Sequence, residues 1–253
     1  MVERKELTNY LNNLLDIQRF SDYGPNGLQI EGNKQIKKVG LAVSATKASI
    51  EKAITENVDA LVVHHGLFWK FHGTRTLKGP FGHRVLSLAR ANINLYGFHL
   101  PLDAHLEHGN AASLAKHLDV SIEGEFGDHE GAPTGVHVRF NKPIAPSELS
   151  QKLEQVLNHS VIHAPGRAEK ISSMGIITGG ANRDWIMAKK ANLDAYLTGE
   201  ISEHDWHEAS EAGIHYFAGG HNATEQFGVL SLKEVIEEKF NLECVYFPSD
   251  NPA

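Results

Sequence analysis

The chain carries two copies of one α/β unit, and this duplication restricts the fold more than any other feature of the sequence. The stretch VGLAVSATKASIEKAITENVDALVVHHG, residues 39–66, aligns at a constant offset with MGIITGGANRDWIMAKKANLDAYLTGEI, residues 174–201. Each copy reads as a strand, a turn rich in glycine or serine, a helix and a second strand. A helix with the same leucine pattern precedes each copy, at 6–15 and 148–157. The repeats predict an α/β fold of two similar units, each with a mixed, mostly parallel sheet flanked by helices.

The match continues downstream, where each copy ends in a histidine followed by a carboxylate. Residues 91–103 align with residues 212–225 once a single gap is allowed. The alignment makes two pairs: His99 with His221, and Asp103 with Glu225. A His-x-x-x-carboxylate pattern that recurs after two apolar strands strengthens the case for a duplication.

A segment rich in glycine and proline separates the two copies. Residues 120–146 carry short alternating stretches between turn residues, which is typical of a hairpin-like linker. We therefore expect two domains, with the first repeat in residues 1–125 and the second in residues 126–253. The C-terminal part of the second repeat could pack with the first.

The composition is that of an ordinary globular protein rather than a membrane or nucleic-acid-binding one. Hydrophobic residues make up 41% of the 253 residues, but no stretch approaches the ~18 consecutive apolar residues of a membrane span. The formal charge is −7 and no basic run is long enough to follow a phosphate backbone, which argues against nucleic acid. The charged N-terminus lacks an apolar signal region, so we expect a cytoplasmic protein. Cys244 is the only cysteine, which excludes an intramolecular disulfide and a cysteine-rich metal site.

Histidine is the compositional exception, and several of the 16 histidines follow apolar runs that read as strands. The stretch DALVVHHG, residues 59–66, is such a run ending in two histidines. Ligands of open α/β sheets gather at the carboxyl ends of strands. Four pairs of residues occupy such ends: His64 with His65, His99 with Asp103, Glu200 with His204, and His221 with Glu225. Imidazole and carboxylate without thiolate suit Zn, Fe, Mn, Co or Ni, so we expect a metal site. The ligand types do not indicate which of these metals it binds.

Two adjacent histidines on one strand raise the question of how many ions are bound. Neighbouring side chains of a regular strand point to opposite faces, so His64 and His65 cannot both serve one centre unless the chain bends at Gly66. Two metal ions would also resolve the conflict. A carboxylate that bridges two ions about 3.5–4 Å apart is the usual way to hold such a pair, and Asp103 is the best-placed candidate.

Five separated motifs carry a family resemblance. They are NGLQ in the first loop, HHGLFWK, HLPLDAH, GEISEHD and GGHNATEQFG. In this order they resemble the motifs of the GTP cyclohydrolase I type 2 family, also called the Nif-three-like family. The resemblance spans nearly the whole chain and implies two intertwined α/β repeats, a dinuclear metal site and a toroidal homohexamer. It corresponds to the short form of the family, without the insertion that some relatives carry between the repeats.

The resemblance also implies roles for individual residues. The family's ligands for two divalent ions fall on these residues: His64, His65, Asp103, His221 and Glu225. His99 matches a histidine beside that site. The aspartate that the family carries after the first strand of the first repeat is replaced here by the sequence SAT, residues 44–46. The chemistry of the local pocket is therefore expected to differ at this point.

A metal-dependent hydrolase acting on a small molecule is the leading hypothesis. A divalent ion lowers the pKa of bound water from 15.7 to about 7, and a second ion polarises the electrophile. If the substrate is a purine nucleotide, as the family label implies, hydroxide attacks C8 of the ring and a histidine protonates the leaving nitrogen. His99 or His204 could be that catalytic histidine, with Glu200 as the residue that orients it.

Other functions fit the same residues. A metal-binding adaptor or metal-delivery protein would use these ligands without catalysis, because no nucleophile or base stands apart from them. A ring that encircles nucleic acid is disfavoured by the acidic balance unless one surface collects the lysines. Residues 66–84 combine aromatic and basic side chains, and they could form either a lid over a nucleotide base and phosphate or a subunit interface.

Overall fold

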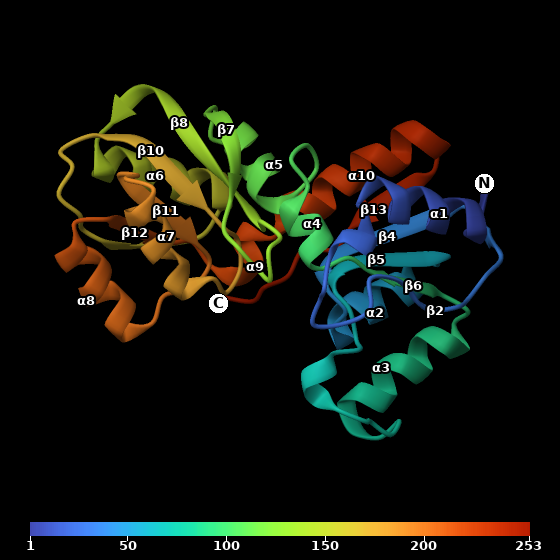
Figure 1. The fold of residues 1–253 in the computed structure, drawn as a ribbon. Helices are drawn as coiled ribbons and strands as arrows, with labels where there is room; N and C mark the ends of the chain where they lie inside the picture. The colour runs from blue at the N-terminus through green and yellow to red at the C-terminus, as the bar shows by residue number, and fades with distance from the viewer. The chain divides into compact units, whose positions relative to one another are not determined.

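The chain forms two compact units, each with its own sheet. The computed structural model describes residues 1–253. The units consist of these segments: Met1–Leu102 with Gly228–Asp250 in unit 1, and Asp103–Phe227 with Asn251–Ala253 in unit 2. The chain leaves unit 1 within α4 (Leu100–Ala104) and returns to it within α10 (Gln226–Phe240) (Figure 1). None of the helices combines the length and the apolar character needed to cross a bilayer.

The sheet of unit 1 has five strands, four of them parallel. Their order across the sheet is β13 (Glu243–Tyr246), β4 (Lys38–Ser44), β5 (Ala60–His65), β6 (Asn94–Gly97) and β2 (Gly27–Ile30). Only β2 runs antiparallel to its neighbour. A separate antiparallel pair joins β1 (Val2–Glu3) to β3 (Gln35–Ile36). The apolar run that leads to the paired histidines is the central strand β5, which is buried because helices cover both faces of the sheet.

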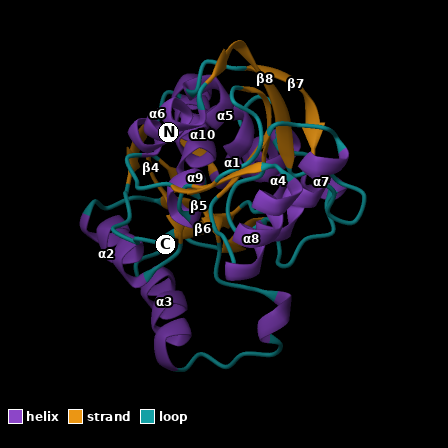
Figure 2. Cartoon of the chain, turned by 90° about the vertical axis from the view of Figure 1, so that its left-hand side faces the viewer, coloured by secondary structure: helices purple, strands orange, loops and turns teal.

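Those helices lie in two layers, one on each face of the sheet, because strands with apolar side chains on both faces must be covered on both. They are α1 (Arg4–Leu14) and most of α10 on one face, and α2 (Lys47–Thr55) and α3 (Gly79–Arg90) on the other (Figure 1; strands and helices are distinguished in Figure 2). Leu7 of α1 and Ile236 of α10 share a core cluster with Val62. Leu88 of α3 shares a second cluster with Val63. Successive residues of β5 thus face opposite layers, as the pleat of a strand requires.

The sheet of unit 2 has six strands around a parallel centre. Their order is β7 (Ser121–Phe126), β8 (Gly135–Ile144), β10 (Ile171–Ile176), β11 (Ala195–Thr198), β12 (His215–Ala218) and β9 (Ile162–Ala164). The strands β10, β11 and β12 are parallel, and the other three run antiparallel to their neighbours.

Helices also cover both faces of the second sheet. They are α5 (Asn110–His117) and α6 (Pro146–Leu157) on one face, and α7 (Trp185–Lys190) and α8 (Glu203–Ala212) on the other; the short α9 (His221–Thr224) follows β12. Leu153 of α6 packs in a cluster with Phe217, and Ala209 of α8 packs in another with Tyr216. The alternation along β12 repeats the arrangement seen along β5.

The order of elements recurs along the chain, as the alignment predicted. The series α1, β2, β4, α2, β5, α3, β6 returns as α6, β9, β10, α7, β11, α8, β12. Each copy gives its last strand to the other sheet: β13, at the end of the second copy, pairs with β4 in unit 1, and β7, which follows the first copy, pairs with β8 in unit 2. The predicted fold of two similar, intertwined α/β repeats is therefore confirmed. The predicted division into two domains, one for each repeat, at residues 125 and 126 stays a prediction.

Candidate metal centre

Three histidines of unit 1 converge at the carboxyl ends of β5 and β6. One ring nitrogen from each of His64, His65 and His99 lies within 4.8 Å of one from each of the others. The ring centroids of the two adjacent histidines are only 4.5 Å apart. Because β5 pairs with β6 only as far as Val63, the backbone of both histidines is released from the sheet on that side. Neighbouring residues that a regular strand would send to opposite faces can therefore turn their rings toward one place.

Hydrogen bonds to Nδ1 fix the tautomers of two of these rings. His64 Nδ1 lies 2.9 Å from the carbonyl oxygen of Phe98 and donates to it. His99 Nδ1 lies 2.7 Å from Oδ1 of Asp22 and donates likewise. When either ring is neutral, its lone pair is therefore on Nε2, which is the nitrogen that a metal ion or a proton would reach.

The SAT sequence has two separate roles in the structure. Ser44 Oγ lies 2.9 Å from His65 Nδ1, so a neutral hydroxyl orients this ring. Thr46 caps α2, because its side chain accepts from the Ser49 amide while the Ser49 hydroxyl accepts from the Thr46 amide. The SAT sequence thus gives His65 an orienting partner but adds no negative charge at this point.

Asp22 is the residue of this group that the sequence did not reveal. It is 6% exposed, and its Oδ1 accepts from His99 Nδ1 and from the Tyr23 amide. Its Oδ2 accepts from the Leu100 amide and from the side chain of Asn26. Burial by itself raises the pKa of Asp22, but the hydrogen bond and charge of His99 and the other donors outweigh it, and the pKa is lowered. An ionised carboxylate therefore holds His99. Its only signal in the sequence is its place just before the NGLQ motif.

The NGLQ motif supports the same group through its two amides. Asn26 Oδ1 accepts from the backbone amide of His99 at 2.8 Å. Gln29 Oε1 accepts from the Leu67 amide at 3.0 Å, and a Cβ on Gly66 would lie 2.3 Å from the Gln29 amide group. The glycine after the paired histidines is therefore needed for a close approach of backbone to side chain.

Unit 2 contains two buried carboxylates. Asp103 is 7% exposed and Glu225 is 3% exposed, and a carboxylate oxygen of one lies within 4.8 Å of an oxygen of the other. Asp103 Oδ1 accepts from Asn110 Nδ2 at 2.9 Å and from Thr178 Oγ1 at 3.2 Å. No sequence pattern pairs these two donors with Asp103, because only the fold brings Thr178 close to it.

An imidazole lies between two carboxylates at the start of α9. His221 Nε2 is 3.2 Å from Glu225 Oε1, and its Nδ1 is 2.6 Å from Glu200 Oε1. Burial by itself lowers the pKa of His221, but hydrogen bonds and charge from Glu225 and Glu200 raise it to about 9. The metal-free ring is therefore an imidazolium, and a metal ion would have to displace its proton from Nε2.

The backbone of Gly179 lies directly beside the side chains of Glu225 and His221. Its φ is +71°, and a Cβ at this position would lie 2.2 Å from Glu225 Oε1 and 3.3 Å from His221 Nε2. Its amide donates to the Thr224 hydroxyl at 3.1 Å. No side chain fits here, so this glycine of the sequence TGGANRDW lets the main chain pass beside the carboxylate.

The residues predicted to act in catalysis fall in different surroundings. His99 lies with His64 and His65, and Glu200 contacts His221. His204 lies in the first turn of α8 with its side chain 52% exposed, 3.5 Å from Asp205 rather than with the carboxylates around His221. Its assignment as a general acid remains a prediction.

Similarity to known proteins extends over the whole chain. A family model described as Duf34/NIF3 (NGG1p interacting factor 3) matches residues 2–252. A Vibrio cholerae protein named GTP cyclohydrolase 1 type 2 homolog is 41% identical over 253 residues, which cover 98% of each chain. A Pasteurella multocida protein of the same name is 40% identical over 249 residues, again with 98% of each chain covered.

Solved structures agree with these relatives. A structure described as protein ybgI, of unknown function, superposes with a TM-score of 0.94 at 35% identity and covers 100% of both chains. The Thermus thermophilus protein TTHA1606 superposes with a TM-score of 0.87 at 33% identity and covers 99% of this chain and 100% of its own. This chain therefore belongs to the Duf34/NIF3 (NGG1p interacting factor 3) family.

Proposed function

We propose that the chain is a metal-dependent hydrolase that holds two divalent ions. The observation that supports this most is the chemistry of two donor groups: converging imidazoles in unit 1, and buried carboxylates with an imidazole in unit 2. The proposed ligands are His64, His65, Asp103, His221 and Glu225. Imidazole and carboxylate oxygen suit divalent ions from Mn and Fe to Co, Ni and Zn, so the metal itself is left open.

The carboxylates of unit 2 fit a cation for an electrostatic reason. Asp103 and Glu225 are both buried and lie close together, and two such carboxylates repel each other unless positive charge compensates them. The imidazolium of His221 supplies part of that charge in the metal-free protein. Asp103 also follows His99 by four residues in the chain, so the short helix α4 links the two donor groups.

The chain's own residues have definable tasks in such a reaction. Divalent ions at a site of this kind supply hydroxide at neutral pH and polarise the electrophile. His99, held by Asp22 in one tautomer, presents Nε2 to accept a proton and to return it to a leaving nitrogen. Glu200 holds the ring of His221 in place. His204 is the second candidate for the proton donor.

The proposed substrate class is a purine nucleotide or a related heterocycle, opened by hydrolysis at the ring carbon between two nitrogens. The support for this choice is the name GTP cyclohydrolase 1 type 2 homolog carried by relatives such as the one from Vibrio cholerae. The toroidal homohexamer implied by the family resemblance is part of the same proposal. Light scattering on the purified protein measures its mass directly.

Metal analysis of protein purified without chelators tests the proposal. We expect about two divalent ions per chain in the wild type and at most one in Asp103→Ala. Glu107→Gln removes an exposed carboxylate four residues further along, and it should leave the metal content unchanged. Equal metal content in wild type and Asp103→Ala would remove Asp103 from the ligands.

A hydrolysis screen separates catalysis from metal storage. Nucleotides and pterins are incubated with the metal-loaded wild type and with Asp103→Ala, and loss of the heterocycle's ultraviolet absorption is followed. Activity that disappears in the variant supports the hydrolase. Full metal loading without turnover of any compound would favour the metal-binding adaptor or metal-delivery protein instead. Activity that survives the substitution would make the catalytic assignment wrong.

A further inference from the structure

The segment between Asp59 and Asp103 is basic in an otherwise acidic chain. It contains no aspartate or glutamate, whereas the whole chain has a formal charge of −7. Its cationic side chains are Lys70, Arg75, Lys78, Arg84 and Arg90. A stretch of one charge sign raises the local concentration of ligands of the opposite sign, so this part of unit 1 attracts anions.

An aromatic pocket lies within this basic segment. Its volume is 210 Å³, and its walls include Pro25, Phe68, Trp69, Arg75, Leu77 and Phe81. Figure 2 shows the loop between the 3₁₀ turn η2 (Lys70–His72) and α3 as a long teal segment that extends away from the sheet. Phe71 stacks on the pocket residue Trp69 with centroids 5.6 Å apart and an interplanar angle of 20°. Phe71 is 69% exposed and Leu77 is 49% exposed, which is a large apolar surface to leave in water.

The cation of the pocket is held in position. The guanidinium carbon of Arg75 lies 3.9 Å from the centroid of the Phe81 ring. Its Nη1 lies 3.0 Å from His72 Nδ1. Contacts on two sides reduce the rotamer freedom of this long side chain, and a preordered guanidinium is suited to a phosphate because it donates two parallel hydrogen bonds.

One side chain connects this pocket to the histidines. The indole of Trp69 meets the His99 ring edge to face at a centroid distance of 5.1 Å, and it lies 6.0 Å from the His65 ring. Its Nε1 donates to the carbonyl of Gly66 at 3.2 Å, which fixes the ring. A smaller cavity lined by His64, His99 and Trp69 adjoins the same indole. A flat group lying against Trp69 would therefore be next to the proposed ligands of unit 1.

We propose that this pocket binds a nucleoside phosphate, with the base stacked in the aromatic walls and the phosphate on Arg75. Stacking on aromatic faces selects a planar ring, and the guanidinium selects an anion, so neither half of the ligand alone satisfies the site. The inference rests on the proposed function, because it names where the substrate of that reaction is recognised. It requires no metal ion for binding itself.

Calorimetric titration of the full chain with three probes tests this assignment. The probes are guanosine 5′-monophosphate, guanosine and inorganic phosphate, added to protein as purified and to protein treated with a chelator. We expect the monophosphate to bind at least tenfold more tightly than guanosine and more tightly than phosphate alone. Arg75→Ala should weaken the monophosphate about tenfold while leaving guanosine within twofold, because a lost charge-assisted contact is worth about that factor.

Two further variants control for misfolding and for nonspecific attraction by positive charge. Leu77→Glu places a carboxylate on an exposed pocket wall without touching the core, and it should weaken the monophosphate at least tenfold. Arg90→Ala removes an exposed cation of the same segment outside the pocket, and it should change nothing. Equal weakening by Arg90→Ala and Arg75→Ala would show diffuse attraction and overturn the site. Absence of monophosphate binding would overturn it as well.

The outcome is distinguishable from failure of the hydrolase proposal. Monophosphate binding that persists in chelated protein and responds to Arg75→Ala supports the pocket even if no turnover is found. A change of oligomeric mass in Leu77→Glu, measured by light scattering, with monophosphate affinity unchanged, would instead mark this face as an interface between copies of the chain and overturn the proposal.

Discussion

The two donor groups differ in the chemistry of their side chains. In unit 1 the group consists of imidazoles, and the one carboxylate beside them, Asp22, hydrogen-bonds the far side of His99. In unit 2 the carboxylates of Glu200 and Glu225 surround the single imidazole of His221 and raise its pKa to about 9. An imidazole binds a metal through one ring nitrogen, so the orientation of its ring decides whether it can bind, whereas clustered carboxylates attract a cation by their charge. If the proposed ligands bind cations, the carboxylates of unit 2 would supply most of the electrostatic attraction, and the hydrogen-bonded rings of unit 1 would mainly supply oriented nitrogen ligands.

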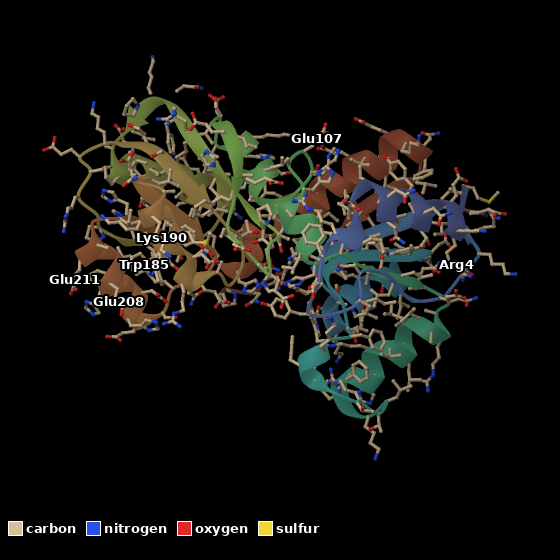
Figure 3. The ribbon with its side chains drawn as sticks, viewed as in Figure 1. Arg4, Glu107, Trp185, Lys190, Glu208 and Glu211 are labelled. Atoms are coloured by element: carbon tan, nitrogen blue, oxygen red, sulfur yellow. The ribbon has the colours of Figure 1, made fainter.

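The segments that follow the central strands differ in the same way. After β5 the chain carries the basic and aromatic loop of residues 66–84. After β11 the chain soon enters α8, which is acidic, and Figure 3 labels two of its exposed carboxylates, Glu208 and Glu211. Two copies of one fold have therefore diverged in the segments that leave the sheet, while the strands and their helical layers are retained. In this fold the loops after the strands are where ligand chemistry changes.

Removal of a carboxylate from unit 2 is the largest effect we expect. Glu225→Gln keeps the shape of the side chain but loses its charge, and it should lower metal affinity more than 100-fold. Mutation of a residue that only supports a ligand typically lowers metal affinity 10–100-fold, and the loss of a ligand itself should lower it further. His65→Asn in unit 1 should cost roughly tenfold less than Glu225→Gln, since it removes a lone pair but no charge. Competition with a metal-sensitive dye measures both. Equal losses would contradict the division between charge and geometry.

The supporting carboxylates give a second and smaller comparison. Asp22→Asn and Glu200→Gln each leave the proposed ligands intact, and each should lower metal affinity about 10–100-fold. Asp22→Asn should also lower turnover at saturating metal, because an amide no longer enforces the tautomer of His99. Glu107→Gln serves as the exposed control for both. Retention of full activity by Asp22→Asn would mean that Asp22 only stabilises the fold.

A matched pair of glycines tests the close approach in unit 2. Gly179 and Gly73 both have positive φ, at +71° and +61°, but only at Gly179 would a Cβ meet Glu225, whereas nothing lies within 4 Å at Gly73. Gly73 has φ +61° and ψ −158°, a region that is essentially restricted to glycine, so Gly73→Ala should cost about 1–3 kcal/mol of unfolding free energy from backbone strain alone. Gly179→Ala should cost more than that and should also weaken metal binding, because Glu225 must move. Denaturant unfolding and metal titration of the two variants separate strain from displacement.

The sequence predicted the fold well because a repeated pattern of strand and helix is local. The apolar run before His64 and His65 predicts a buried strand, and the rule that ligands gather at strand ends predicts where the side chains lie. The pairing of β13 with β4 was not predicted in this detail, because a short terminal strand carries no information about its neighbour.

The residues that support the proposed ligands could not be predicted from the sequence, for a different physical reason. Asp22 contacts His99 across 77 residues, and Thr178 contacts Asp103 across 75. The residues joined by such hydrogen bonds are not spaced at the period of a helix or of a strand, so no sequence pattern indicates them. The proposed ligands could be selected by chemistry and by position at strand ends, whereas the groups that orient them become visible only when distant segments are brought together.

The smallest effect expected is a pH dependence confined to unit 2. His163 Nε2 donates to His215 Nδ1 at 3.0 Å, and its ring stacks on Phe217 with centroids 4.4 Å apart. Burial, and then the charge of His215, lower the pKa of His163 to about 4. The unfolded chain therefore binds a proton at this residue before the folded chain does, so stability is lost as the pH falls from about 6.5 to about 4. His163→Gln should flatten part of this loss in thermal unfolding between pH 7.5 and pH 4.5. Parallel curves for variant and wild type would show that the buried pair does not contribute to the acid sensitivity.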